Sequence, residues 1–386
     1  MLDSYPKICY GLVLPGGSAR GAYQVGVLKA ISEFMPEDRC PFDVMTGTSV
    51  GAINTVFVAS RAHAFREGMK QMEVLWAGLH AEKVYNTGFL VSLRTALHWI
   101  AALVFMGLGK HNPIALLDNG PLEELLELEI DFENLRKNIS EGLIRAVGIS
   151  ASSYAHSRAV TFFQGHKDIE EWERKRRDGK RAELTAHHLA ASASLPFMFC
   201  AKSIDGEYFG DGSLRLNAPL SPAIHLGASR ILVIGIRDKK PDFNPEDSKD
   251  NHHPTLGSLA GHLLDIAFSD NLDADIERLR RINKTLSYMD NTQREKTEMK
   301  CIDIMQVQPS EDIREIAGRY LHELPWTLRM LIRGVGGQDE DWRLPSYFLF
   351  ESGFTKELIK LGYKDAMAQR DELTAFFDQE RAVAVS

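Results

Sequence analysis

The 386-residue sequence has few cysteines and no excess of positive charge. Its four cysteines, Cys9, Cys40, Cys200 and Cys301, are scattered, without the spacing of a zinc site or of a disulfide framework. We therefore expect inert thiols in a reducing compartment, and no metal. The formal net charge of −8 disfavours general nucleic-acid binding, and no loop has the aspartate spacing of a calcium site.

Long hydrophobic runs are also scarce. The first residues lack the basic and then apolar pattern of a signal peptide, so we expect a cytoplasmic protein. Residues 95–109 (TALHWIAALVFMGLG) are apolar nearly all round. As a helix they would span about 22 Å, less than the roughly 30 Å of a bilayer core. This stretch therefore favours a buried core helix, an interfacial helix at the inner face of a membrane, or a lid, over a membrane span.

What the sequence does contain is typical of a globular α/β protein, with 44% hydrophobic and 25% charged residues. Two consecutive units, each an apolar strand, a glycine-containing turn and a helix, begin the chain. The first combines a strand at 8–14 with a helix at 22–34, and the second combines a strand at 42–45 with a helix at 52–59. They predict a mostly parallel central sheet sandwiched by helices.

The later chain continues this pattern. Further strands are expected at 143–149, 159–163, 230–236 and 301–308. A polar, proline-containing loop at 239–254 indicates a weak boundary. We therefore expect one domain over 8–236 and a mostly helical C-terminal region over 237–386, packed on that domain or completing it.

The second turn reads Gly47-Thr48-Ser49-Val50-Gly51, the pattern G-x-S-x-G. Between a strand and a helix this pattern forms a nucleophile elbow, which presents the serine at a strained apex. Gly47 and Gly51 leave room for the bend, and the helix N-terminus favours developing negative charge. The pentapeptide alone is also compatible with an ordinary strand–helix turn.

The first turn, residues 16–21, reads Gly-Gly-Ser-Ala-Arg-Gly. Backbone N–H groups of Gly16, Gly17 and Ser18 can approach a reacting carbonyl and form an anion-binding nest ahead of the helix. A dinucleotide-binding loop would need G-x-G-x-x-G, and Ser18 stands where the second glycine of that pattern belongs.

A serine nucleophile needs a base within hydrogen-bond reach. Several histidines follow Ser49, but none lies in a pattern typical of a catalytic loop: His187, His188, His225, His252, His253 and His262. Asp211 is better placed, because it stands between Gly210 and Gly212 in a turn that leaves its carboxylate free.

These motifs resemble those of the patatin-like phospholipase family. The glycine loop at 16–21 is similar to the family's oxyanion motif, and 47–51 to its elbow. Residues 191–196 resemble the small-residue segment ahead of the family's aspartate, and 211–213 its Asp-Gly turn. A tail at 346–366 resembles bacterial members less specifically.

The chain departs from the family pattern at two positions. Ser18 replaces a third glycine, and Ser213 a small residue after the aspartate. We expect the loop to tolerate Ser18 if its backbone conformation is attainable, and Ser213 to fit because it is small.

The resemblance implies a serine lipid acyl hydrolase of phospholipase A or lysophospholipase type, with a Ser49–Asp211 dyad and no cofactor. Amides of Gly16, Gly17 and Ser18 would hold the oxyanion, and Arg20 would order the loop or contact a phosphate. The substrate would be a phospholipid or another acyl lipid, met at a membrane surface.

Two other interpretations stay open. One is an α/β-hydrolase esterase with a Ser-His-Asp triad, although the elbow follows only one earlier strand. The other is a catalytically inactive, membrane-associated scaffold of the same fold, to which the replacement at Ser18 gives slight support.

Overall fold

The computed structural model describes residues 8–85, 115–238, 253–297, 299–336 and 342–378. The predicted interfacial or lid segment at 95–109 lies outside these ranges. No helix within them is both long and apolar enough to cross a bilayer.

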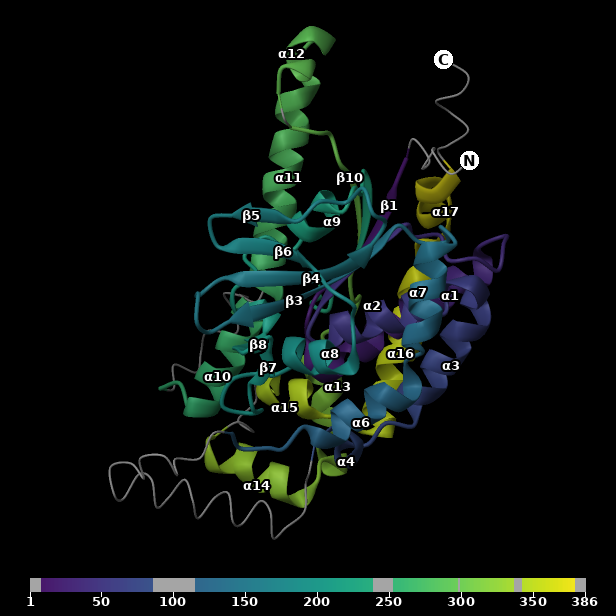
Figure 1. The fold of residues 1–386 in the computed structure, drawn as a ribbon. Helices are drawn as coiled ribbons and strands as arrows, with labels where there is room; N and C mark the ends of the chain where they lie inside the picture. Colours follow the sequence, from purple (N-terminus) through teal and green to yellow (C-terminus); the bar gives the residue numbers. More distant parts are fainter. Residues whose placement is uncertain (1–7, 86–114, 239–252, 298, 337–341, 379–386) are drawn as a thin grey trace.

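A mixed sheet with a parallel centre organises the fold (Figure 1). Five neighbouring strands run parallel, in the order β10 (Asp303–Val307), β9 (Arg230–Ile234), β1 (Tyr10–Leu14), β2 (Val44–Thr48) and β3 (Ala146–Ser153). Beyond them lie β4 (Ala159–Gly165), β6 (Arg177–Arg181) and β5 (Trp172–Arg174), while β8 (Glu207–Asp211) pairs with β3 and with β7 (Lys202–Ile204). The predicted strands are confirmed, with shifted ends.

The β5–β6 hairpin was not predicted. Its residues are mostly charged, so they lack the alternating hydrophobic pattern of a half-buried strand. Charged side chains are common on edge strands, where they discourage pairing with another chain, so an edge strand gives a weak hydrophobic signal.

Both faces of the sheet are covered by helices. Successive residues of a strand point to opposite faces, so Leu12 and Leu14 join one hydrophobic core and Val13 joins the other. On the first face lie α1 (Ala22–Phe34), α2 (Val50–Ser60), α3 (Phe65–Ala77) and α16 (Ser352–Ala368). On the second lie α9 (Ser221–His225) and α11 (Asn271–Ser287). The predicted sandwich is confirmed.

The remaining helices surround this frame. They are α4 (Ala81–Val84), α6 (Gly120–Glu129), α7 (Phe132–Ser140), α8 (Ala186–Ser192), α10 (Leu256–Asp265), α12 (Asn291–Glu295), α13 (Ile313–Tyr320), α14 (Trp326–Gly334), α15 (Arg343–Phe348) and α17 (Arg370–Asp378). Short 3₁₀ turns include η1 (Ser18–Gly21) and η4 (Gly212–Leu214), and η5 (Ile266–Asp270) is a π-helical turn between α10 and α11.

The C-terminal region shares the sheet and the core of the first 236 residues. Its strand β10 extends the sheet beside β9, and its helix α16 crosses α1 at two glycines. A Cβ atom on Gly26 would lie 2.0 Å from the Ile359 carbonyl oxygen, and one on Gly362 would lie 2.2 Å from that of Tyr23. The two helix backbones therefore touch, and only glycine allows this approach.

Candidate active site

The register of the sheet brings Ser49 and Asp211 together. Strand β2 runs parallel to β3 and ends with Thr48 opposite Ser150. Strand β8 runs antiparallel to β3 and ends with Asp211 opposite Ala151, which directly follows Ser150 on β3. Because β4 occupies the other edge of β3, β2 and β8 share one edge and run toward each other. Their ends meet, so the first residue after β2 faces the last residue of β8.

Ser49 occupies the apex of the predicted strand–turn–helix unit. Its backbone has φ 55° and ψ −128°, a conformation that few non-glycine residues adopt, and it directly precedes α2. A Cβ on Gly47 would lie 2.2 Å from the Gly51 carbonyl oxygen, and one on Gly51 would lie 2.1 Å from that of Leu14. Both glycines are therefore required for the strand, the elbow and the helix to pack this closely.

Asp211 is buried, with 1% of its surface exposed. Its Oδ1 accepts a hydrogen bond of 2.9 Å from the Ser213 amide, while Oδ2 has no regular hydrogen-bond partner among the described residues. Burial raises the pKa of this carboxyl to about 6, and the nearby Ser49 hydroxyl and Ser213 partly oppose the rise. The result is a carboxylate close to the Ser49 hydroxyl, with more basicity than an ordinary aspartate.

One short segment supports both side chains. The Ser192 hydroxyl accepts a 2.9 Å hydrogen bond from the Ser49 amide and donates one of 2.6 Å to the Ser150 carbonyl. Two residues later, the Ser194 carbonyl accepts a 2.8 Å bond from the Asp211 amide. The sequence indicated this small-residue segment, but it did not indicate that Ser192 and Ser194 hold the elbow and the aspartate in place.

The glycine loop lies against the Asp211 turn. A Cβ on Gly16 would lie 2.6 Å from Ser213 Oγ, and one on Gly17 would lie 2.2 Å from Ile236 Cδ1. Ser18 adopts φ 52°, in the left-handed region that glycine prefers, so the replacement fits the loop at some conformational strain. Among the described residues, no group accepts a hydrogen bond from the amides of Gly17 and Ser18.

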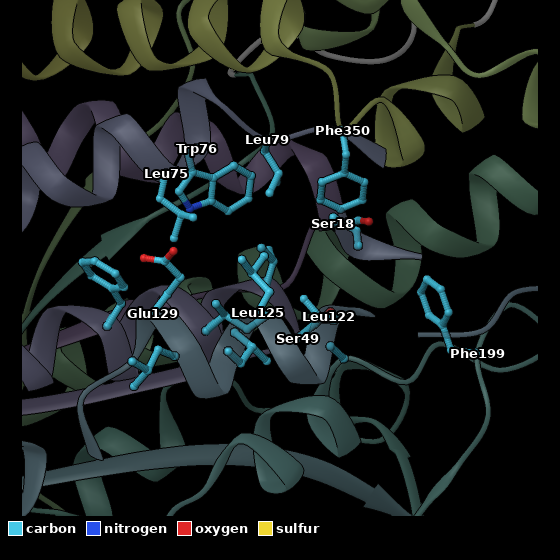
Figure 2. A pocket seen from close by; sticks show the side chains of 17 residues that line it. Ser18, Ser49, Leu75, Trp76, Leu79, Leu122, Leu125, Glu129, Phe199 and Phe350 are labelled. Carbon is cyan, nitrogen blue, oxygen red and sulfur yellow. The ribbon is translucent and has the colours of Figure 1, made fainter. Parts of the chain in front are cut away.

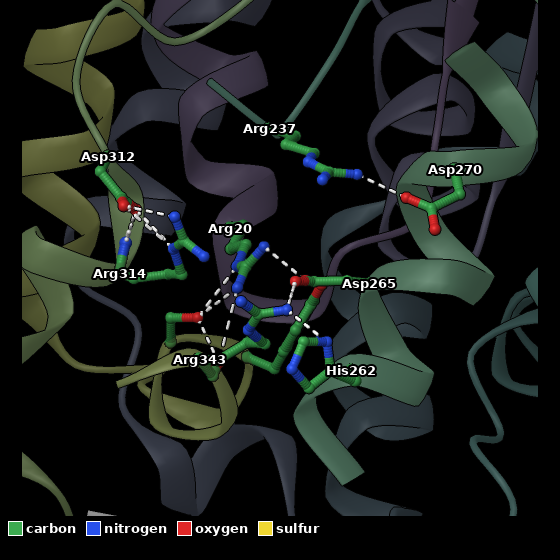
Figure 3. A network of polar contacts seen from close by, with 10 residues as sticks. Arg20, Arg237, His262, Asp265, Asp270, Asp312, Arg314 and Arg343 are labelled. Atoms are coloured by element: carbon green, nitrogen blue, oxygen red, sulfur yellow. Dashed lines mark hydrogen bonds and ion pairs between the residues drawn. The ribbon is translucent and has the colours of Figure 1, made fainter. Parts of the chain in front are cut away.

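Arg20 lies in the glycine loop and is held there by a network of polar contacts (Figure 3). Its guanidinium is 3% exposed and pairs with Asp265 at 3.3 Å. It also donates to the Ser346 hydroxyl at 2.9 and 2.7 Å, and it lies 3.8 Å from the centre of the Tyr347 ring. Asp265 in turn pairs with Arg343 at 2.9 Å. These contacts fit a role in ordering the loop, and Arg20 does not line the cavity described next.

Ser49 and Ser18 open onto an apolar cavity of about 700 Å³, counting its part open to solvent (Figure 2). Its walls come mainly from α2, α3 and α6, with aromatic side chains from two loops. Glu129 is its only charged lining residue among those described, and it lies toward the opposite end from Phe199. The lining includes Ile53, Phe57, Leu75, Trp76, Leu79, Leu122, Leu125, Leu126, Phe199 and Phe350.

No histidine lines this cavity in the described part of the chain. His187 contacts Glu123 at 2.7 Å, and His225 stacks on Trp172. The described ranges also hold no group of three or more histidine, cysteine, aspartate or glutamate side chains arranged to bind a metal.

Comparisons with known proteins agree with the motifs. A family profile described as Patatin-like phospholipase matches residues 12–224, more than half of the chain. Lysophospholipase nte1 of Aspergillus terreus is 50% identical over 52 residues, which are 14% of this chain and 3% of that protein. The patatin-like phospholipase domain-containing protein ZK370.4 of Caenorhabditis elegans is 39% identical over 71 residues, 16% of this chain and 5% of that protein. The chain thus matches only a small part of these relatives.

Among solved structures, VipD from Legionella pneumophila aligns with 96% of this chain and 68% of its own, at 13% identity and a TM-score of 0.39. ExoU from Pseudomonas aeruginosa, solved in complex with SpcU, aligns with 86% of this chain and 60% of its own, at 14% identity and a TM-score of 0.28. Similarity at this level supports no conclusion about activity or partners.

Proposed function

The chain belongs to the patatin-like phospholipase family, and on this premise we propose that it is a serine lipid acyl hydrolase of phospholipase A or lysophospholipase type. The observation that carries the proposal is the meeting of Ser49 and buried Asp211 at one edge of β3. The cavity beside Ser49 is apolar, as a fatty-acyl chain requires.

In the proposed mechanism, Ser49 Oγ attacks the ester carbonyl while Asp211 accepts the hydroxyl proton. Amides of Gly16, Gly17 and Ser18 donate to the oxyanion, and the helix N-terminus behind Ser49 adds a favourable field. Asp211 then returns the proton to the leaving alcohol, which leaves an acyl-serine. Water attacks this ester, loses its proton to Asp211, and the fatty acid departs as Ser49 recovers its proton.

The raised pKa supports Asp211 in this role. A general base acts best when its pKa is near the working pH, and burial raises the pKa of Asp211 to about 6. The position of Asp211 beside the Ser49 hydroxyl also favours it over a histidine, since no histidine in the described ranges lines the cavity onto which Ser49 opens. We propose that the substrate is reached at a membrane surface, with the protein peripheral and cytoplasmic.

The test is hydrolysis of a mixed lipid extract, with products read by mass spectrometry. Ser49→Ala and Asp211→Asn should each lower the rate by about 10²–10⁴-fold, because each removes a group that acts in the transition state. Ser140→Ala, which changes an exposed hydroxyl on α7, is the matched serine control.

Two results would overturn the proposal in different ways. Loss of activity on replacing a single histidine would indicate a Ser-His-Asp triad. Failure of a fluorophosphonate to label Ser49 in the folded protein, together with no release of fatty acid, would indicate an inactive scaffold.

A further inference from the structure

Helix α10 (Leu256–Asp265) has the reverse of the usual surface-helix pattern. Its buried positions, Gly257, Gly261 and Asp265, recur every fourth residue and therefore share one face. Large aliphatic side chains point outward instead, from the helix and the first residue of η5. They are Leu256, Leu259, Leu263 and Ile266, which are 73%, 47%, 67% and 51% exposed. A surface helix ordinarily buries such residues, so this face is suited to contact something apolar.

The inward-facing residues of α10 contact the arginines that lie beside the glycine loop. Asp265 reaches inward to pair with Arg20 at 3.3 Å and with Arg343 at 2.9 Å. A Cβ on Gly261 would lie 3.1 Å from the Arg343 side chain, so glycine lets α15 approach closely. The outward leucines contribute to none of these contacts, and within the described ranges they join neither hydrophobic core.

The outward face of α10 also lacks the acidic side chains that predominate in the chain as a whole. The formal net charge is −8, yet between Thr255 and Ser269 the only acidic residue is Asp265, which is buried. The adjacent turn η4 contacts η5 and adds the exposed side chains of Leu214 and Arg215. The first exposed acidic residue after the strip is Asp270 at the end of η5, and it pairs with Arg237. The strip itself holds no acidic side chain, which is compatible with contact to lipid headgroups.

We propose that this α10 face, residues Leu256, Leu259, Leu263 and Ile266, docks onto the surface of a phospholipid bilayer. The proposal rests on the proposed lipid hydrolase function and assigns the surface through which the enzyme meets its substrate. Amphipathic helices bind bilayers by burying an aliphatic face of this kind at the interface.

A protein partner fits this face less well. A stable protein interface buries about 800 Å² on each partner and is enriched in tyrosine, tryptophan and arginine. The α10 face offers four aliphatic side chains on about three helical turns. A bilayer needs no matching shape and accepts such a narrow strip.

The same segment touches the proposed oxyanion loop from its inner side. Asp265 holds Arg20, and the Phe268 ring lies where a Cβ on Gly16 would be only 2.7 Å away. Docking by the α10 face would therefore place the bilayer surface on the outer side of the helix whose inner side holds this loop, roughly one helix diameter of 10 Å from it.

The test uses co-sedimentation with phosphatidylcholine vesicles, in a Ser49→Ala background so that no lipid is consumed. Leu259→Gln together with Leu263→Gln should lower vesicle partitioning at least about tenfold, because a leucine transferred from water contributes more than a tenfold factor. Leu128→Gln on α6, at 83% exposure, is the matched control and should partition like its parent. Thermal unfolding checks that each variant is folded.

The outcomes separate this proposal from the proposed function. Equal partitioning of the folded double variant and its parent, or an equal loss in Leu128→Gln, overturns the docking surface. A dimer that the double variant dissociates also overturns it, because the face would then bind a second copy. Vesicle binding that depends on α10, in a protein whose Ser49 form releases no fatty acid, would leave the docking surface standing and overturn the hydrolase.

Discussion

At the scale of single residues, the proposed chemistry depends on where Asp211 is buried. Its carboxyl is 1% exposed, and one oxygen lacks a regular hydrogen-bond partner among the described residues. Burial without full hydrogen bonding destabilises the ionised form and raises the pKa to about 6. The residue that we propose as the general base is therefore also one that costs stability at neutral pH.

We predict that kcat/KM rises with pH through about 6 and is level above it, because Asp211 must be ionised to accept the Ser49 proton. Below that pH the carboxyl is protonated and cannot act as a base. A rate profile measured with a dispersed short-chain ester checks this. A rising limb centred near the usual aspartate pKa would contradict the assigned cause.

The stability of Asp211→Asn is the control for this assignment. The native carboxyl keeps its proton to a higher pH than the unfolded one, so stability is unaffected below about pH 4 and falls as pH rises toward 6. At neutral pH the asparagine variant should therefore be more stable by up to about 3 kcal/mol. Denaturant unfolding at several pH values measures the difference, and equal pH dependence in both proteins would exclude Asp211 as the titrating group.

At the scale of elements, the glycine loop is held by residues from the other end of the chain. Arg20 lies within the loop, while its partners Asp265 and Ser346 lie on α10 and α15. Asp265 and Arg20 are both buried, and Asp265 also pairs with Arg343, so removing Asp265 leaves two buried arginines without this counter-charge.

We predict that Asp265→Ala lowers the free energy of unfolding by about 3–5 kcal/mol, because Arg20 and Arg343 both lose a buried counter-charge. In the protein that remains folded, kcat should fall more than KM rises, since the loop would act in the transition state. Chemical denaturation and steady-state kinetics measure the two effects. Glu183→Gln, which breaks an exposed pair with Arg136, should change either quantity little. Unchanged kcat in folded Asp265→Ala would exclude the anchoring role.

At the scale of the whole molecule, we propose that residues 237–386 complete the catalytic domain. Strand β10 continues the parallel sheet, and α16 packs directly on α1 through Gly26 and Gly362. A chain ending at residue 236 would expose the β9 edge and the apolar face of α1, so we expect that residues 8–236 do not fold independently.

We predict that Gly362→Ala destabilises the whole protein by several kcal/mol, because the new Cβ would lie 2.2 Å from the Tyr23 carbonyl oxygen and force α16 away from α1. Gly334→Ala, at the end of α14, is the matched control. A Cβ there meets no atom within 4 Å, and alanine favours helix, so stability should hold or rise slightly. Thermal unfolding compares the two. Equal stability of the variants would show that the α1–α16 contact does not hold the regions together.

The sequence by itself determined the local features: the strand–turn–helix units, the elbow at Ser49, the Asp211 turn and the family. Each depends on residues close together in the chain, where glycine positions and hydrophobic periodicity act directly. Membership of the family and the sandwiched sheet are confirmed, while the roles of the site residues stay predictions.

Only the tertiary structure decided how distant segments meet. The pairing register on β3 sets Ser49 against Asp211, and Ser192 then fixes the elbow. No local pattern pairs Arg20 with Asp265, because that pair spans 245 residues and arises from packing of α10 against the loop. The outward direction of the α10 leucines likewise comes only from the packing, since periodicity gives the faces of a helix but not which face the core takes.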